Sequence, residues 1–281
     1  MQRRSTRLEQ VAASGPADRT IGVSVVMTTF DAERYVVPSS RSVLDQVHQS
    51  FELVIQDDGS RDSTVELVRS LEDPRVRLIA SERTGRAAAL NSAIRASRGG
   101  IVAINDADDI SLPFRLAVIE ECLERNPDVV LVGTVALNTR TFPPASSLVT
   151  SARPPSGELP AKEVDHLQLY RRNPFVHSTV AFRRSAWDRI GGYDEQLPMC
   201  VDYDLFLRLA GLGRVLMVEY PTVVHYEHPD SYFKRRGASE YLRVLRRIRT
   251  RARRGLRIPA WARLFDVIPY LQATRAVLVR P

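Results

Sequence analysis

The feature that most constrains the fold is a regular alternation of short β-branched runs with longer amphipathic stretches over the first 125 residues. Four runs are apolar on both faces or nearly so, which is typical of buried parallel strands: 21–27, 51–55, 76–79 and 101–104. Apolar residues recur at helical spacing in 35–47, 63–71, 85–96 and 112–125. Strands that alternate with helices form βαβ units. The sequence therefore predicts an α/β fold with a doubly wound, mostly parallel sheet flanked by helices.

The rest of the chain is less regular. Ser63 and Glu66 have the spacing of a capping box, which places the start of one helix at residue 63. Further on we expect helices over 161–171 and 202–211, strands over 176–183 and 215–218, and a surface loop over 138–160. Residues 1–20 are polar and lack the apolar core of a signal peptide, so we expect a flexible leader there.

Composition excludes several classes of protein. The 281 residues are 44% hydrophobic and 26% charged, which excludes disorder throughout. No apolar run is long enough to cross a membrane. The two cysteines, Cys122 and Cys200, cannot form a disulfide framework or a zinc pattern, which fits a reduced, cytoplasmic compartment.

The net charge of +7 is concentrated near the C-terminus. Residues 234–257 contain eleven Lys or Arg and one acid, which suggests an anionic surface as partner. Leu242, Leu245 and Ile248 form an apolar stripe beside the arginines of a helix over 239–249, and a second amphipathic stretch covers 258–271. Basic helices with Trp, Phe and Leu lie in bilayer interfaces. We hypothesise peripheral attachment to the inner face of a membrane through 234–271. The alternative is a basic C-terminal extension that packs on the fold.

Acidic residues follow two of the predicted strands, at the edge where open parallel sheets bind ligands. Asp106 and Asp108 are two residues apart, so in extended backbone both carboxylates face one site, and oxygen ligands of this kind suit Mg²⁺ or Mn²⁺. Such a cation would stabilise a diphosphate leaving group. The alternative is an acidic turn in which Asp109 or Ser111 caps the helix near Pro113.

Two other acidic pairs have a functional and a structural interpretation. Asp58, after the second strand, would accept a hydrogen bond from a base or ribose, or else stabilise an Asx turn before Gly59. Asp202 and Asp204, taken by their position alone, complement the dipole at a helix N-terminus, and a catalytic role for one of them follows only from the resemblance given below. His177 contacts a sugar or is a satisfied core histidine. Composition and spacing leave these alternatives open.

Taken together, the motifs resemble those of the family 2 glycosyltransferases, which are inverting enzymes with the GT-A fold. The nucleotide-side motifs are 23–30, 57–60, 85–91, 106–109 and 113–116, and the acceptor-side motifs are 173–184, 191–195 and 202–208. The resemblance covers roughly 21–230. It implies a GT-A catalytic domain over 21–232, with a nucleotide-binding half over 21–115 and an acceptor-binding half over 116–232, followed by a basic helical extension over 233–281.

The resemblance also implies roles for individual residues. The residues expected to bind the nucleotide-diphosphate sugar are Thr28, Phe30, Asp57, Asp58, Arg86 and Asp106. Asp108 would be the principal ligand of Mn²⁺ or Mg²⁺, assisted by Asp106 and His228, and Asp202 would be the general base. The implied reaction transfers a sugar, from UDP in the first instance, to a glycan or lipid-linked acceptor in cell-surface polysaccharide or glycolipid synthesis.

The chain departs from the family pattern at four places. Phe30-Asp31 replaces a frequent Tyr-Asn, Val201 replaces the Glu before the catalytic Asp, Leu90 replaces an Arg, and His225-Tyr226 replaces a Tyr-Arg. The last departure bears on the role of His228. None of the four removes a residue that the chemistry requires.

A nucleotidyltransferase and a nucleic-acid binder are the two alternatives to sugar transfer. A nucleotidyltransferase would show a Gly-rich, basic loop after the first strand, whereas 28–33 contains no glycine and two acids. A nucleic-acid binder would act through the arginine-rich segment, but no recognisable nucleic-acid module is present, so no nucleic-acid partner is expected.

Overall fold

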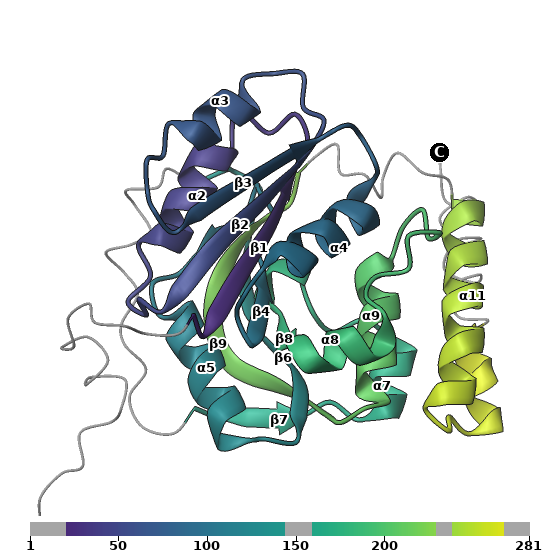
Figure 1. Cartoon of the computed structure of the whole chain (residues 1–281). Helices are drawn as coiled ribbons and strands as arrows, with labels where there is room; N and C mark the ends of the chain where they lie inside the picture. The colour runs from purple at the N-terminus through teal and green to yellow at the C-terminus, as the bar shows by residue number, and fades with distance from the viewer. Residues whose placement is uncertain (1–20, 144–158, 229–237, 267–281) are drawn as a thin grey trace, which may run out of the picture.

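The computed structural model describes residues 21–143, 159–228 and 238–266, which form a nine-stranded sheet with helices on both faces (Figure 1). The sheet order is β3-β2-β1-β4-β8-β6-β9-β5, and β7 pairs with β9. The strands are β1 Val23–Thr29, β2 Phe51–Asp58, β3 Val76–Ser81, β4 Ile101–Ile104, β5 Ile110–Ser111, β6 Val129–Thr139, β7 Ala161–Glu163, β8 Ala181–Arg183 and β9 Arg214–Tyr226.

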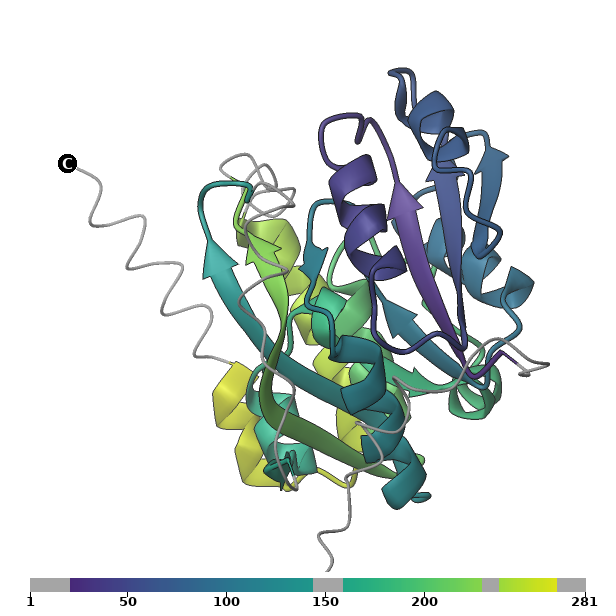
Figure 2. The same ribbon diagram turned by 90° about the vertical axis from the view of Figure 1, so that its left-hand side faces the viewer.

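The four predicted parallel strands are confirmed and form one half of the sheet. β1 lies between β2 and β4, with Val23 opposite both Phe51 and Ile101, and β3 adds to β2 in the same direction. The carboxyl ends of β1, β2 and β4 therefore meet at one edge. β8 runs antiparallel to β4 and β6, while β6 and β9 pair in parallel at the other end of the sheet (Figure 2).

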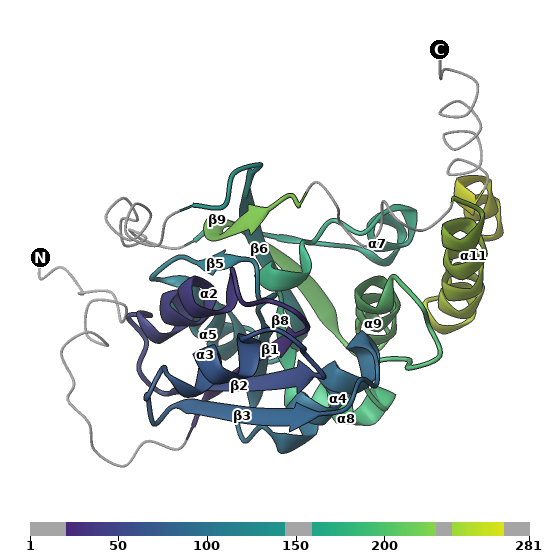
Figure 3. The ribbon, with the colours of Figure 1, turned by 90° about the horizontal axis from the view of Figure 1, so that it is seen from above.

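Helices cover the two faces of the sheet and bury two separate apolar clusters. α4, α8 and α9 pack over one face, and α2, α3 and α5 over the other (Figure 3). The helices are α2 Val36–Leu44, α3 Thr64–Arg69, α4 Arg86–Ala96, α5 Arg115–Arg125, α7 His166–Arg171, α8 Arg184–Ile190, α9 Val201–Ala210 and α11 Ala238–Gly255, with 3-10 turns η1 His177–Thr179 and η2 Ala260–Arg263.

The second half of the chain differs from the sequence-based expectation in several elements. The strand predicted over 176–183 is wrong in its first part, which forms the turn η1 before the short strand β8. The helix predicted over 161–171 begins as strand β7 and becomes helical only at His166, where Asp165 forms a capping box with Gln168. Strand β6 and helix α8 were not predicted.

Strand β9 is longer than the predicted 215–218 because it continues past a proline. Its pairing with β6 shifts register between Thr134 and Ala136, opposite Pro221. Proline is tolerated in a sheet at such irregularities because it has no N–H to donate. Beyond the shift, β9 pairs with the two-residue strand β5 and reaches the edge where β4 ends.

The predicted basic helix is confirmed as α11, which packs beside α9 (Figure 1). Within the described residues, no helix combines the length and apolar character needed to cross a membrane. Three predicted features lie partly or wholly outside the described residues: the leader over 1–20, most of the loop over 138–160, and the end of the stretch over 258–271.

Candidate active site

The acidic loop after β4 is held in place by a buried polar network. The side-chain amide of Asn105 donates to Ser39 Oγ at 3.1 Å, and its oxygen accepts from Ser111 Oγ at 2.8 Å and from Arg115 Nη1 at 3.0 Å. Arg115 is fully buried, and burial lowers its pKa to about 10, so it remains charged at neutral pH. This network fixes the direction in which the following carboxylates leave the sheet.

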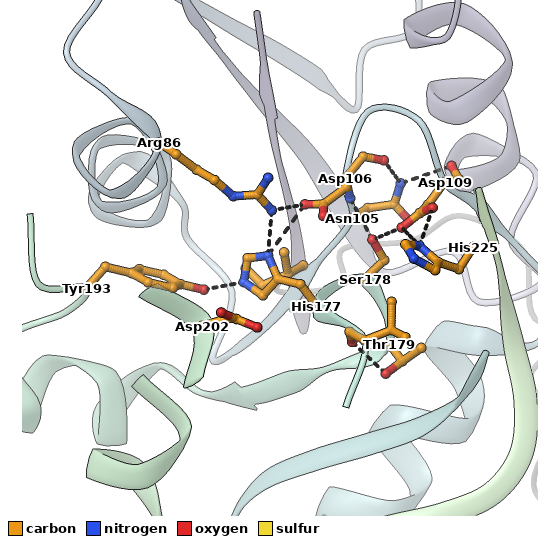
Figure 4. Close-up of polar contacts among 12 residues, drawn as sticks. Arg86, Asn105, Asp106, Asp109, His177, Ser178, Thr179, Tyr193, Asp202 and His225 are labelled. Carbon is orange, nitrogen blue, oxygen red and sulfur yellow. Dashed lines mark hydrogen bonds and ion pairs between the residues drawn. The ribbon is translucent and has the colours of Figure 1, made fainter. Parts of the chain in front are cut away.

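The first carboxylate of the loop, Asp106, is engaged by a chain of polar side chains (Figure 4). Arg86 Nη2, from the first turn of α4, donates to Asp106 Oδ1 at 2.6 Å and lies 2.9 Å from His177 Nδ1. His177 Nδ1 also lies 3.4 Å from Asp106 Oδ1, and His177 Nε2 is hydrogen-bonded to the Tyr193 hydroxyl at 2.9 Å. Burial acts to raise the pKa of Asp106, but the charges and hydrogen bonds of Arg86 and His177 together hold that pKa well below its usual range.

The second carboxylate, Asp108, has a different electrostatic environment. Burial, followed by the negative charges of Asp109 and Asp106, raises the pKa of Asp108 to about 7. Its ionised form is therefore disfavoured unless positive charge arrives nearby. A carboxylate in this condition can accept a cation or a proton, whereas Asp106 is already neutralised by Arg86.

The third carboxylate, Asp109, anchors the loop to the far half of the sheet. It is completely buried and accepts hydrogen bonds from Ser178 Oγ, from His225 Nδ1 at 3.0 Å and from the Tyr226 backbone N–H at 3.0 Å. The Asp109 hydrogen bond raises the pKa of His225. The alternative in which Asp109 or Ser111 caps α5 is wrong, since the N-cap is Phe114 and no side chain caps that helix.

The donor set of this loop fits a hard divalent cation that also binds a substrate phosphate. No cluster of three or more His, Cys, Asp or Glu side chains suited to a metal occurs in the part of the chain that the structure describes. Mg²⁺ in phosphate chemistry is bound by one or two carboxylates and completed by substrate oxygens, which Asp106 and Asp108 can provide. The His228 ring packs edge-on against the rings of Tyr35 and Tyr226. Burial and, to a smaller extent, the charge of Asp108 raise the pKa of the Tyr35 hydroxyl.

Asp57 and Asp58, the pair predicted to bind the base, end β2 and accept hydrogen bonds from main-chain N–H groups. Asp57 accepts from Thr29 Oγ1 at 2.8 Å and from the backbone N–H groups of Gly59 and Ser60, so the turn expected at Asp58 is made by Asp57 instead. Asp58 accepts from the backbone N–H groups of Thr84, at 2.6 Å, and Gly85, at 3.0 Å. Gly85 has a φ of +96°, which favours glycine. Asp58 thus ties β2 to the start of α4.

The end of β1 presents a partly exposed aromatic face beside this pair. Thr28 is half-buried on β1, and the Phe30 ring is 36% exposed. The Arg83 guanidinium carbon lies 3.7 Å from the Phe30 ring centroid, in a cation–π contact. Phe30 therefore occupies the edge predicted for the nucleotide base, and Arg83 is a neighbour that the sequence analysis did not identify.

The predicted general base, Asp202, lies on the first turn of α9 and faces the same edge. Asn173 Nδ2 donates to Asp202 Oδ2 at 2.9 Å. Figure 4 shows Asp202 beside His177 and Tyr193, and burial followed by the Asp202 charge raises the pKa of Tyr193 well above its usual value. The structure therefore brings Asp202 to the polar chain that ends on Asp106.

The neighbouring acid, Asp204, has a structural environment instead. It is 1% exposed and accepts from Arg208 Nε at 2.7 Å and from Arg251 Nη1 of α11 at 3.1 Å. The two acids at the start of α9 therefore point to different surroundings. Asp204 joins α9 to α11, whereas Asp202 remains at the edge of the sheet.

Several residues of the site were not identified from the sequence as parts of it. They are Asn105, Asp109, Arg115, Asn173, Tyr193 and His225. Some of these residues lie inside the acceptor-side motifs or next to the acidic loop. Their position in or beside a motif could have indicated that they belong to the site. Their hydrogen-bond partners lie far away along the chain and could not be assigned from the sequence.

Solved structures with similar folds include two sugar-nucleotide complexes. S. aureus TarS 1-349 in complex with UDP-GlcNAc matches with a TM-score of 0.66 and 17% identity, over 81% of this chain and 65% of that chain. Mannosyltransferase PcManGT from Pyrobaculum calidifontis, in complex with GDP-Man and Mn²⁺, matches with a TM-score of 0.65 and 20% identity, over 96% and 81%. These matches confirm the predicted GT-A-type fold.

Sequence relatives with established names come from bacterial polysaccharide systems. The Escherichia coli chondroitin synthase is 25% identical over 232 residues, which cover 79% of this chain and 32% of that protein. The succinoglycan biosynthesis protein ExoO of Rhizobium meliloti (strain 1021) is 31% identical over 207 residues, which cover 72% of this chain and 59% of that protein. The chain thus spans between about a third and three fifths of the length of these relatives.

The family model described as Glycosyl transferase family 2 matches residues 24–191, which is more than half of the chain. The match includes β1 to β4, the acidic loop and the His177 segment, so it covers the nucleotide-side geometry described above. The chain therefore belongs to glycosyltransferase family 2.

Proposed function

We propose that this chain is an inverting, metal-dependent glycosyltransferase that moves a sugar from a nucleoside-diphosphate sugar, in the first instance a UDP-sugar, to an acceptor hydroxyl. The observation that supports this most directly is the meeting of two unlike carboxylates at one edge. Asp108 has a destabilised negative charge next to Asp106, and Asp202 lies across from them beside His177. Two carboxylates with different environments suit two different roles.

The donor nucleotide would bind across the carboxyl ends of β1, β2 and β4. Phe30 offers an apolar face to the base, with Arg83 already stacked on it. Asp58 and Thr28 border the same place, and Arg86, which donates to Asp106 at 2.6 Å, would contact a diphosphate bound beside that carboxylate. The UDP-GlcNAc and GDP-Man complexes of the two structural relatives support a nucleotide sugar as donor.

Asp108, with Asp106 and with His228 as a further candidate, would hold Mn²⁺ or Mg²⁺. When bound, the cation would supply positive charge against the leaving diphosphate. The residues of the chain prepare that place. Asn105 and Arg115 fix the loop from below, and Asp109 fixes it from the β9 side. The Mn²⁺ in the PcManGT complex supports a metal of this type.

Asp202 would take the proton of the acceptor hydroxyl as it attacks the anomeric carbon opposite the diphosphate. A general base must reach the hydroxyl within about 2.6–3.2 Å, so its orientation matters. The amide of Asn173 holds one carboxylate oxygen of Asp202 at 2.9 Å, which leaves the other oxygen available for the hydroxyl. Direct displacement of this kind inverts the configuration of the sugar.

The acceptor would be a growing glycan or a lipid-linked sugar in cell-surface polysaccharide or glycolipid synthesis. The names of the relatives, a chondroitin synthase and a succinoglycan biosynthesis protein, support this class. The residues on the acceptor side include His177 and Tyr193, which are hydrogen-bonded to each other beside Asp202.

Release of nucleotide from a panel of UDP-, GDP- and dTDP-sugars in Mn²⁺ or Mg²⁺ tests the proposal. We expect metal-dependent release from one donor by the wild type and at least a hundredfold loss in Asp108→Ala. The matched control is Asp188→Ala, because Asp188 is an exposed aspartate of α8. Calorimetry of nucleotide binding, with and without Mn²⁺, distinguishes an inactive site from one that waits for its acceptor. Absence of both turnover and nucleotide binding would overturn the proposal.

A further inference from the structure

The apolar stripe of α11 is not available to a membrane. Leu242, Leu245 and Ile248, which the sequence analysis assigned to bilayer contact, are 8%, 5% and 1% exposed. Leu245 and Ile248 belong to the same buried cluster as the apolar residues of α9. This part of the membrane hypothesis is wrong, because the stripe that would enter a bilayer is already packed against protein.

A basic groove lies on the side of α11 that faces η2. Its volume is about 510 Å³. Four arginines line it, Arg246, Arg249, Arg253 and Arg263, together with a single acid, Asp266. Asp266 pairs with Arg253 and lies 3.7 Å from Arg249 Nη1, so one carboxylate is shared by two of the four arginines. The groove therefore keeps an excess of positive charge and fits an anionic group.

One of these arginines is buried in an unusual way. Arg249 is 3% exposed, and its two terminal nitrogens donate to the backbone carbonyls of Phe265 at 2.7 Å and Arg171 at 2.8 Å. Its Nε atom has no hydrogen-bond partner in the described part of the chain. A buried guanidinium with an unused donor is costly, and negative charge in the groove that Arg249 lines would stabilise its positive charge.

The two most exposed large apolar side chains among the described residues lie next to this groove. Leu264 is 69% exposed and Trp261 is 55% exposed, three residues apart on and just after η2. Arg263, which lines the groove, lies between them in the sequence. Exposed Trp and Leu beside several arginines form the combination that binds at the surface of an anionic bilayer.

We propose that the groove formed by α11 and η2 binds the phosphate headgroups of an anionic phospholipid bilayer, with Trp261 and Leu264 entering its interface. Arg246 and Arg263 attract the headgroups, and Arg249 adds a fixed positive charge to the lining of the groove. A membrane explains Leu264 better than a nucleic acid does, because an exposed aliphatic side chain gains from an apolar interface. This inference does not depend on the identity of the sugar donor.

Flotation of the full chain with vesicles tests the proposal. We expect binding to vesicles of phosphatidylcholine with 30% phosphatidylglycerol and little binding to phosphatidylcholine alone. Each arginine near an anionic surface contributes about fivefold to partitioning, so the pair Arg246→Gln and Arg263→Gln is expected to lower it by roughly 25-fold. The pair Trp261→Ser and Leu264→Ser is expected to lower it at least tenfold.

The matched control removes two charges elsewhere. Arg41 and Arg69 are exposed on α2 and α3, at the opposite side of the molecule from α11, and Arg41→Gln with Arg69→Gln is expected to bind like the wild type. A cooperative thermal unfolding transition checks that each variant is folded. Vesicle binding that Trp261→Ser with Leu264→Ser leaves unchanged would overturn the proposal. So would duplex DNA binding at 150 mM salt that exceeds vesicle binding and depends on Arg246 and Arg263.

Discussion

At the scale of single residues, the two acids at the start of α9 look alike in the sequence and differ in the structure. Asp202 has one hydrogen bond from Asn173 and faces the sheet edge, whereas Asp204 is buried between Arg208 and Arg251. Their position on one helix is equally favourable to the helix dipole for both. The surroundings of the carboxylates, more than the spacing in the motif, separate a candidate base from a structural ion pair.

This difference predicts opposite outcomes for two conservative variants. Asp202→Asn is expected to lower the turnover of sugar transfer by about 10²–10⁴-fold, with nucleotide binding and melting temperature nearly unchanged. Asp204→Asn is expected to lower the free energy of unfolding by about 2 kcal/mol, because two arginines lose a buried charged acceptor. Steady-state kinetics and thermal unfolding of both variants check this. Loss of stability in Asp202→Asn, or of turnover alone in Asp204→Asn, would reverse the assignment.

The two cysteines provide a second prediction at this scale. Burial, followed by the charge of Glu121, raises the pKa of Cys122 to about 11, and burial, followed by Asp202, raises that of Cys200 to about 12. Since only the thiolate reacts, native alkylation at pH 8 is expected to be at least roughly a hundredfold slower than for an unfolded thiol with a pKa of about 8.5. Mass spectrometry after timed iodoacetamide treatment, with and without urea, measures both rates. Rapid native labelling of Cys200 would contradict its environment in the structure.

At the scale of elements, local patterns predicted what local contacts stabilise. The runs that became β1, β2 and β4 are almost entirely buried, so the pattern was sufficient for them. β3 is partly exposed at the edge of the sheet and was predicted from its apolar residues Val76, Leu78 and Ile79. β7 was mistaken for helix because all three of its residues are exposed and only pairing with β9 defines it. η1 was mistaken for strand because its buried polar side chains bind distant groups, such as Ser178 with Asp109.

The site shows the same division between local and distant information. Asp106, Asp108 and Asp202 were predicted because they lie in short motifs, and in the structure the charges of all three act on Arg86. The role of Asp109 was missed because its partner His225 is 116 residues away. Such a pairing depends on β9 continuing past Pro221 to the acidic loop, which no local pattern indicates.

Two helix N-termini show that a capping motif in the sequence does not always form the cap hydrogen bonds in the structure. Ser63 has the spacing of a capping box, yet its side chain makes no cap hydrogen bond to α3. Asp165 accepts from the Gln168 backbone N–H at 2.7 Å and forms a complete capping box at α7. Asp165→Ala is therefore expected to lower the free energy of unfolding by about 1 kcal/mol, and Ser63→Ala by a few tenths at most. Urea denaturation of the two variants measures both values, and an equal effect would contradict the structure.

At the scale of the whole molecule, the basic extension and the catalytic fold share one apolar cluster. Val244, Ile248 and Ala252 of α11 pack in the cluster that also contains Leu205 and Phe206 of α9. Arg251 adds ion pairs to Asp204 and to Asp194, which precedes α9. The described part of the extension is therefore stabilised by the fold on which it packs, while arginines such as Arg243, Arg246 and Arg254 remain exposed.

This shared cluster predicts that α11 and the catalytic fold unfold together. Ile248→Ala removes a side chain that is 1% exposed, so it is expected to cost about 2–4 kcal/mol and to shift one cooperative transition to lower temperature. Arg254→Ala, at an exposed position of the same helix, is expected to change stability by less than about 0.5 kcal/mol. Far-ultraviolet circular dichroism follows the helix content, which includes α11. The fluorescence of Trp187, which lies in the same cluster, follows the catalytic fold. With the second tryptophan replaced in a Trp261→Phe background, coincident curves support joint unfolding. If α11 unfolds first and leaves the Trp187 signal unchanged, the extension is an independent unit and its packing contributes nothing to the catalytic fold.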